Sequence, residues 1–155
     1  MSYHIIWKNP DSSIKVTNMH EVATLEATVE HKNILIAQGE LASFQVIIRT
    51  EQLPQERYFR NAWRFDGNNV ILDTATCRQR HLDKLRRIRN SKLQDSDADY
   101  VRALEQDDQT KLAALKTYRQ ALRDMPQISA IEFQTAATSE AIRNIQPAIL
   151  TAPKP

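Results

Sequence analysis

The residue types and spacing most suggestive of chemistry are those of Asp73, Cys77 and His81. Steps of four residues place all three on one face of a helix, where a thiol nucleophile, a base and an orienting carboxylate are imaginable. Successive groups on one helix are, however, about 6 Å apart, and a working triad needs converging elements. We therefore expect no catalytic residues. Asp73 is predicted to cap a helix after a strand, and alanine at Cys77 or His81 is predicted to leave a stable, functional protein.

The histidines and glycines argue against metal and nucleotide chemistry. A structural zinc site needs four ligands, whereas the remaining histidines are scattered, at His4, His20 and His31. The chain has two glycines, too few for a glycine-rich phosphate loop. We expect no metal, no cofactor and no enzymatic activity.

Alternating acidic residues at Asp95, Asp97 and Asp99 look like the start of a calcium loop. Such a loop needs glycine at its sixth position and glutamate at its twelfth. The chain has Tyr100 and Gln106 there, within a helical pattern. The acidic residues are therefore predicted to form a solvated helix face.

Charge is distributed unevenly along the second half of the chain, although the net charge is only +2. A basic run is opposed only by Asp83 and comprises Arg78, Arg80, Lys84, Arg86, Arg87, Arg89 and Lys92. Apart from Arg102, the next stretch is acidic, with Asp95, Asp97, Asp99, Glu105, Asp107 and Asp108. If a second helix folds back, three further cations come to lie near the basic run: Lys116, Arg119 and Arg123. This end of the hairpin, the basic end, would then be positively charged.

This basic end has two competing interpretations. It either docks on an acidic partner or is neutralised by residues 1–73, which are slightly acidic. Nucleic acid is a third and less favoured partner, because single-stranded binders need stacking aromatics and Tyr100 and Tyr118 are isolated. For the docking interpretation, the predicted contacts are Arg86, Arg87, Arg119 and Arg123.

A second candidate surface follows from an aromatic cluster at residues 58–65. Alternation on a strand would turn Phe59, Asn61 and Trp63 to one face, with Tyr58, Arg60, Ala62 and Arg64 on the other. Tyrosine and arginine are favoured at protein interfaces. Tyr58, Arg60 and Arg64 are therefore predicted to bind protein, although cross-strand stacking explains them nearly as well.

The elements that would position these residues begin with strands. β-Branched and aromatic runs predict strands at Tyr3–Trp7, Ile14–Thr17, Phe44–Arg49, Tyr58–Phe65 and Val70–Asp73. The first two strands flank a turn and predict a hairpin, as do the last two. Between the second and the third of these strands, one apolar stripe is formed by Val22, Leu25 and Val29. This stripe predicts a short helix at Glu21–Lys32.

From Thr76 to Met125 the chain contains no glycine or proline, and leucines recur at helical intervals. Asp108 is a suitable cap for a new helix, so two helices folded into a hairpin are predicted, with one long helix as the alternative. Their core would join Leu112, Leu115 and Leu122 to Leu82, Leu85 and Leu104. Pro126 should end the second helix. A brief strand at Ile131–Phe133, a short helix from Thr138 to Ile145 and a loose tail should follow.

The length of 155 residues suits a single core. The fold class predicted is α+β, with a β-rich region at 1–73, a helical hairpin at 74–126 and a C-terminal segment at 127–155. One cysteine indicates a reducing compartment. The chain shows neither a signal peptide nor a membrane-spanning run.

Several segments resemble proteins encoded among tailed-phage structural genes. One likeness begins at Leu53-Pro54 and continues through Arg57–Trp63 and the β-hairpin that ends at Asp73. It extends to His81 and Ile88-Arg89 in the following helix. The other, Tyr118–Pro126, is similar to the Tyr-Arg-Gln-Ala-Leu-Arg-Asp-Leu-Pro ending of the phage tail assembly chaperone family. This resemblance implies a non-enzymatic protein of the phage tail or tail fibre.

The resemblance implies tail or tail-fibre proteins as partners and leaves a homo-oligomer in a symmetric assembly open; no membrane is involved. The expected location is the virion tail, or the host cytoplasm during assembly. The well-populated β region favours a retained structural adaptor, with a transient assembly chaperone and a nucleic-acid binder as alternatives.

Overall fold

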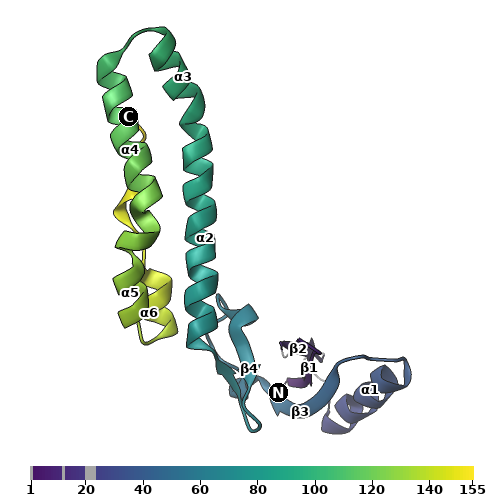
Figure 1. Cartoon of the computed structure of the whole chain (residues 1–155). Coiled ribbons are helices and arrows are strands. Elements are labelled where there is room, and N and C mark those ends of the chain that lie inside the picture. Colours follow the sequence, from purple (N-terminus) through teal and green to yellow (C-terminus); the bar gives the residue numbers. More distant parts are fainter. Residues whose placement is uncertain (1, 12, 20–23) are drawn as a thin grey trace. The chain divides into compact units, whose positions relative to one another are not determined.

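The computed structural model describes residues 2–11, 13–19 and 24–155. The chain divides into two compact units, Met1–Asp73 and Thr74–Pro155. Within the described residues, the first contains antiparallel strands and one α-helix, and the second is helical (Figure 1). The predicted α+β class, with a β region followed by a helical hairpin, is therefore confirmed.

The first unit is built around a three-stranded antiparallel sheet. Its strands are β1 (Tyr3–Lys8), β2 (Ile14–Asn18) and β3 (Ser43–Arg49), in the order β2-β1-β3. In the central strand Ile5, Ile6 and Trp7 are completely buried. Since successive side chains point to opposite faces, the sheet must be covered on both sides.

A different element covers each face of the sheet. On one face Ile6 and Ile48 pack with Trp63 and Val70, which come from a hairpin of β4 (Trp63–Phe65) and β5 (Val70–Leu72). On the other face Ile5 and Trp7 pack with Leu35 of helix α1 (Leu25–Ala37). Burial of such side chains supplies about 1.5–3 kcal/mol each, which makes β1 the centre of the unit.

Helix α1 differs in extent from the prediction. It begins at Leu25, after Thr24, whose side chain accepts a hydrogen bond from the Ala27 N–H at 3.2 Å, and it continues to Ala37. Of the predicted start, Glu21 and Val22 lie outside the described residues. Leu25 and Val29 of the predicted apolar stripe do lie in the helix, but both side chains are exposed, and Thr28 is buried.

The predicted strand Tyr58–Phe65 is mostly wrong. Only its last three residues pair, and a 3-10 helix, η2, occupies Arg60–Ala62. Phe59, Ala62 and Trp63 are all buried, a spacing of three and four that a turn of helix satisfies and a strand does not. A second 3-10 helix, η1, follows β3 at Thr50–Gln52.

Two antiparallel arms form the helical hairpin of the second unit. The first arm is α2 (Thr74–Asp95) and α3 (Asp97–Glu105), interrupted only at Ser96, and the second is α4 (Gln109–Ile128). Asp108 caps α4 as predicted, accepting a hydrogen bond from the Lys111 N–H at 2.9 Å.

Most of the predicted hairpin core is confirmed. Leu85, Leu112, Leu115 and Leu122 are buried, but Leu104 is 53 % exposed because neighbouring Ala103 faces α4 in its place.

Two predicted features after Leu122 are wrong. Pro126 lies inside α4. A proline removes its own N–H donor and crowds the carbonyl four residues earlier, but the helix continues past it, and the Ser129 N–H bonds to the Met125 carbonyl at 3.0 Å. Residues 131–133 belong to helix α5 (Ala130–Thr135) rather than a strand. Helical bonding from the Phe133 N–H to the Ser129 carbonyl satisfies the backbone locally, which an isolated strand cannot do.

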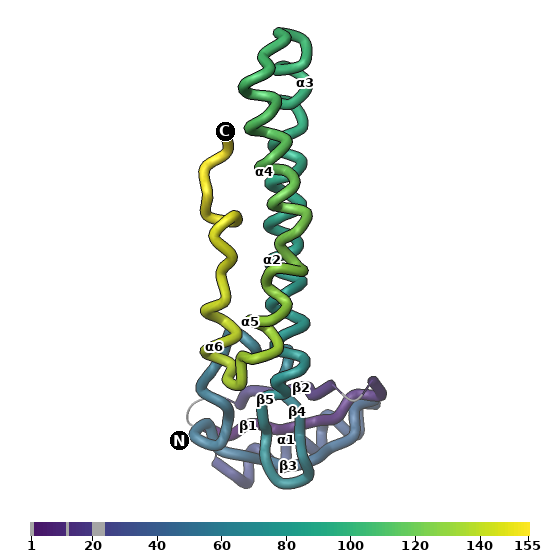
Figure 2. The backbone as a smooth tube through the Cα atoms, turned by 60° about the vertical axis from the view of Figure 1, so that its left-hand side comes forward, coloured from purple at the N-terminus to yellow at the C-terminus, as the bar shows by residue number. Residues whose placement is uncertain are grey.

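The C-terminal segment lies along the hairpin and is not a loose tail (Figure 2). Helix α6 (Ser139–Asn144) is capped by Thr138, close to the predicted start, and 3-10 helix η3 (Ala148–Leu150) follows. Ile142 and Leu150 are buried, and η3 contacts both α2 and α4. The Lys154 ammonium bonds to the Asp95 carbonyl at 3.0 Å and pairs with Asp99, so the chain is anchored almost to its end.

Candidate protein-binding site

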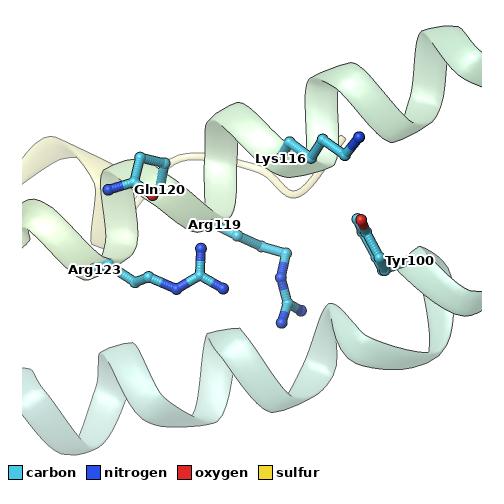
Figure 3. Close-up of a pocket in the computed structure, with 5 residues that line it drawn as sticks. All are labelled: Tyr100, Lys116, Arg119, Gln120 and Arg123. Carbon is cyan, nitrogen blue, oxygen red and sulfur yellow. The ribbon is translucent and has the colours of Figure 1, made fainter.

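A basic hollow lies between the two arms of the hairpin, beside α3 and α4. Its lining residues are Tyr100, Lys116, Arg119, Gln120 and Arg123, and its volume is about 320 Å³. Figure 3 shows Arg119 and Arg123 extending from α4 toward the facing arm, with Tyr100 extending from α3. Among the residues that the structure describes, three cations and no carboxylate line it. The hollow is therefore suited to an anionic group.

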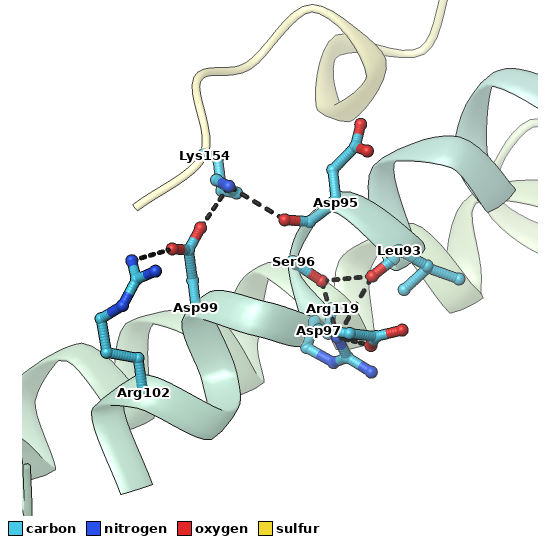
Figure 4. A network of polar contacts seen from close by, with 8 residues as sticks. All are labelled: Leu93, Asp95, Ser96, Asp97, Asp99, Arg102, Arg119 and Lys154. Carbon is cyan, nitrogen blue, oxygen red and sulfur yellow. Dashed lines mark hydrogen bonds and ion pairs between the residues drawn. The ribbon is translucent and has the colours of Figure 1, made fainter. Parts of the chain in front are cut away.

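Arg119 is fixed within this hollow by the junction of α2 and α3. Its Nη1 lies 2.6 Å from Ser96 Oγ, 2.6 Å from Asp97 Oδ1 and 3.2 Å from the Leu93 carbonyl oxygen (Figure 4). Its guanidinium also lies 5.5 Å from the centre of the Tyr100 ring. The Arg119 side chain is only 17 % exposed. The prediction that Arg119 is an exposed docking residue is wrong about its exposure, because it clamps the two arms together.

Lys116 and Arg123 differ from Arg119. Both side chains are exposed, and with the described residues neither makes a hydrogen bond or an ion pair. They lie one helical turn on either side of Arg119, so the hollow has a fixed cation at its centre and an available one at each end.

The acidic part of the hairpin is partly neutralised within the unit. Asp97 pairs with Arg119, and Asp99 pairs with Arg102 and Lys154. Bonding to the Lys154 ammonium holds the pKa of Asp99 below its ordinary value. Two carboxylates of the predicted acidic helix face, Asp97 and Asp99, thus form ion pairs within the protein, and the face is not wholly solvated.

The two α2 arginines predicted to bind a partner do not line the hollow. Arg86 Nη1 lies 3.2 Å from Asp83 Oδ1, and Arg87 Nε lies 3.4 Å from the Asp83 carbonyl oxygen. Arg78, in the same basic run, donates to the Ala136 carbonyl at 2.8 Å and so holds the end of α5 against α2. Arg78, Arg86 and Arg87 of the basic run therefore make hydrogen bonds within the second unit.

The three candidates of the first unit are exposed, although the strand alternation used to select them is wrong. Tyr58 packs edge-to-face on the buried Phe59 ring, with centroids 4.7 Å apart. Arg60 is exposed, and Arg64 forms an ion pair with Asp73 at 2.9 Å. Asp73 directly precedes α2 and so lies where a cap was predicted.

Cys77 and His81 are both buried. His81 Nε2 donates to the Ile145 carbonyl at 2.9 Å, and the imidazole lies 5.8 Å from the Phe133 ring. Burial lowers the pKa of His81 below its ordinary value of 6.5, which favours the neutral ring. His81 thus joins α2 to the segment after α6. Because the ring is buried and bonded, we now expect His81→Ala to lower the stability of the protein, whereas the sequence predicted no effect.

Across the part of the chain that the structure describes, no three His, Cys, Asp or Glu residues gather in a group able to hold a metal ion. No helix within residues 2–11, 13–19 and 24–155 combines the length and apolar character that a membrane crossing requires.

An exposed apolar surface on α1 was missed by the sequence reasoning. Leu25, Val29 and Ile36 lie on one side of the helix, and each is more than one third exposed. Phe44 of β3 is also exposed, with the Lys32 ammonium 4.9 Å from its ring centre. The helical period of Leu25 and Val29 was the available signal, but it was used only to predict a helix. We call Leu25, Val29 and Ile36 the α1 apolar stripe.

Part of the chain is similar to a known protein family. Residues 82–136, which run from α2 to just beyond α5, match the family described as phage tail assembly chaperone protein. The matched segment includes the whole basic hollow and the Arg119 clamp. No curated protein and no solved structure matches the chain. The resemblance to a phage tail assembly chaperone is therefore confirmed over this segment.

Proposed function

We propose that this protein is an adaptor of the bacteriophage tail or tail fibre, which binds other tail proteins and remains in the virion. The match over residues 82–136 supports a role in phage tail assembly. The adaptor role rests on one observation. A compact unit with its own two-sided core, Met1–Asp73, lies outside the matched segment.

Each unit offers a surface suited to protein binding. The second unit has the basic hollow, and the first has the α1 apolar stripe. Apolar side chains clustered on a surface commonly mark sites of protein contact. Two different surfaces on two units are what an adaptor between two tail proteins requires.

The proposal includes the absence of enzymatic activity. Cys77 and His81, the pair most suggestive of catalysis, are buried, and the His81 imidazole is bonded to a backbone carbonyl. These positions support structural tasks for both side chains.

A transient assembly chaperone is the second candidate. The matched family supports it directly, because the match covers most of the hairpin and all of α5. Such a protein would act in the host cytoplasm and leave before the particle is complete. Presence or absence in purified virions separates the two candidates.

Deletion of the gene from the phage tests the role in assembly. We expect electron microscopy to show capsids without complete tails, with recovery when the wild-type protein is supplied in the host. Complete tails in the absence of the protein would contradict the proposal.

Paired variants can connect the defect to a surface. Leu25→Gln with Val29→Gln changes the α1 apolar stripe, whereas Ile34→Gln changes an exposed apolar residue on the opposite side of α1. All three side chains are at least one third exposed, so the fold should tolerate these changes. We expect only the stripe variant to fail in supporting tail assembly.

A further inference from the structure

We propose that the basic hollow receives an acidic peptide segment of a partner protein in an extended, polyproline-II-like conformation. This inference rests on the proposed function, because it names the chemistry of the partner that the hairpin binds. It assigns the contacts to Lys116 and Arg123, with Arg119 as the fixed centre of the site.

Charge is the first argument. All three charged residues that line the hollow are cations. Asp97 balances Arg119, whereas Lys116 and Arg123 are exposed and unpaired with respect to the described residues. A carboxylate at each end of the hollow would therefore meet a cation that no other described group engages.

The spacing of the two cations is the second argument. Lys116 and Arg123 are seven residues apart, so they lie on one face of α4 and about 10 Å apart along the helix axis. A polyproline II chain rises about 3.1 Å per residue and repeats every three residues. Acidic side chains three positions apart therefore project from the same side about 9 Å apart, close to the axial separation of about 10 Å between positions 116 and 123 of α4.

The rigidity of the centre is the third argument. Three oxygen atoms near Nη1 and the Tyr100 ring hold Arg119 in place. A site whose centre is already ordered loses less conformational entropy when a ligand binds. The hollow is thus prepared for a ligand, and only its two end cations must become ordered.

Tyr100 also bears on the choice between peptide and nucleic acid. Single-stranded nucleic acid is bound on aromatic side chains that stack with successive bases. Of the described residues that line the hollow, Tyr100 alone is aromatic, and the Arg119 guanidinium already lies against its ring. These contacts favour the carboxylates of a peptide over a polynucleotide.

Fluorescence anisotropy with the full-length protein tests the inference. The probe is a labelled peptide rich in alanine and proline that carries two glutamates three residues apart. Its matched isomer carries the same glutamates side by side, and a third peptide has glutamine in their place. We expect the spaced peptide to bind most tightly, with an affinity that falls as salt is added.

Lys116→Gln combined with Arg123→Gln should weaken binding of the spaced peptide about tenfold or more, because two charge-assisted hydrogen bonds are lost. Arg80→Gln is the matched control, since Arg80 is an exposed cation of α2 outside the hollow. It should leave the affinity within about twofold, as only screened long-range attraction changes. Unchanged melting temperatures would show that every variant is folded.

Failure of the spaced peptide to bind, equal binding of the isomer, or equal binding by the double variant would each overturn the inference. Preferential binding of single-stranded DNA at the same residues would overturn it in favour of nucleic acid. Normal tail assembly with the double variant, in a phage that needs the wild-type protein, would overturn the inference and leave the proposed function standing. Tail assembly without the protein would contradict the proposed function itself.

Discussion

Replacement of Arg119 by alanine should destabilise the second unit far more than replacement of Arg123, four residues later on the same helix. Arg119 Nη1 contacts Ser96 Oγ, Asp97 Oδ1 and the Leu93 carbonyl oxygen, whereas Arg123 has no such bond with the described residues. The comparison separates a clamp from an available cation on one helix.

The magnitude follows from the contacts. A hydrogen bond from a charged group contributes about 1.5–3 kcal/mol, and Nη1 has two hydrogens for three acceptors, so the contacts share donors. The pair with Asp97 adds only about 0–1 kcal/mol, because the Asp97 side chain is 61 % exposed. Contact with the Tyr100 ring adds about 0.5–1 kcal/mol. We expect Arg119→Ala to lower the free energy of unfolding by about 2–4 kcal/mol and Arg123→Ala by at most about 0.5 kcal/mol.

Urea denaturation followed by helical circular dichroism is the assay. Tryptophan fluorescence reports the first unit, because both tryptophans lie there, so the helical signal must be followed for the second. With an m-value of about 2 kcal/mol/M, the midpoint for Arg119→Ala should fall by about 1–2 M. Arg119→Lys should recover only part of the loss, since an ammonium lacks the planar guanidinium. Equal midpoints for the two alanine variants would refute the clamp.

Three further perturbations test the packing, the buried histidine and the C-terminal segment. Leu115→Ala should cost about 2–5 kcal/mol in urea denaturation, because Leu115 is completely buried and its removal leaves a cavity; a loss below about 1 kcal/mol would contradict the hairpin core. Because the pKa of His81 is lowered, the folded state binds fewer protons than the unfolded state, and stability should fall as the pH drops below 6.5. His81→Gln should reduce this fall but not remove it, since burial also lowers the pKa of His4. The same pH dependence of stability in His81→Gln and in the wild-type protein would contradict the role given to His81. Leu150→Ala should cost more than 1 kcal/mol, whereas Lys154→Ala, at an exposed ion pair, should cost at most about 1 kcal/mol; the reverse order in thermal melts would show that the segment is not packed.

The features that could be predicted from the sequence are those that neighbouring residues determine. Strands β1, β2 and β3 follow from dense β-branched and aromatic runs. The turn of the hairpin follows from Asp108, whose carboxylate can cap a helix without any distant partner.

The errors concern residues whose positions depend on distant parts of the chain. Leu25 and Val29 have a correct helical period, yet a period does not state which side of the helix meets the sheet. Phe59 to Trp63 suit a strand by composition, but packing on the sheet selects a 3-10 turn. Tertiary contacts decide between such alternatives.

The candidate site shows the same limit. Arg119 and Arg123 are indistinguishable in the sequence, since both are arginines on the exposed side of a predicted helix. Only the position of Ser96 on the facing arm makes one a clamp and leaves the other available. The anchored C-terminal segment was missed because Thr-Ala-Pro-Lys-Pro has the composition of a tail, and the contacts of Lys154 are 55 or more positions away in sequence.

Quantitative mass spectrometry of purified virions tests the central claim most directly. The adaptor account predicts that peptides from both units are present in a constant ratio to tail proteins, and that they remain after stringent purification. The contradicting result would be complete, infectious virions that lack the protein while infected cells contain it in abundance.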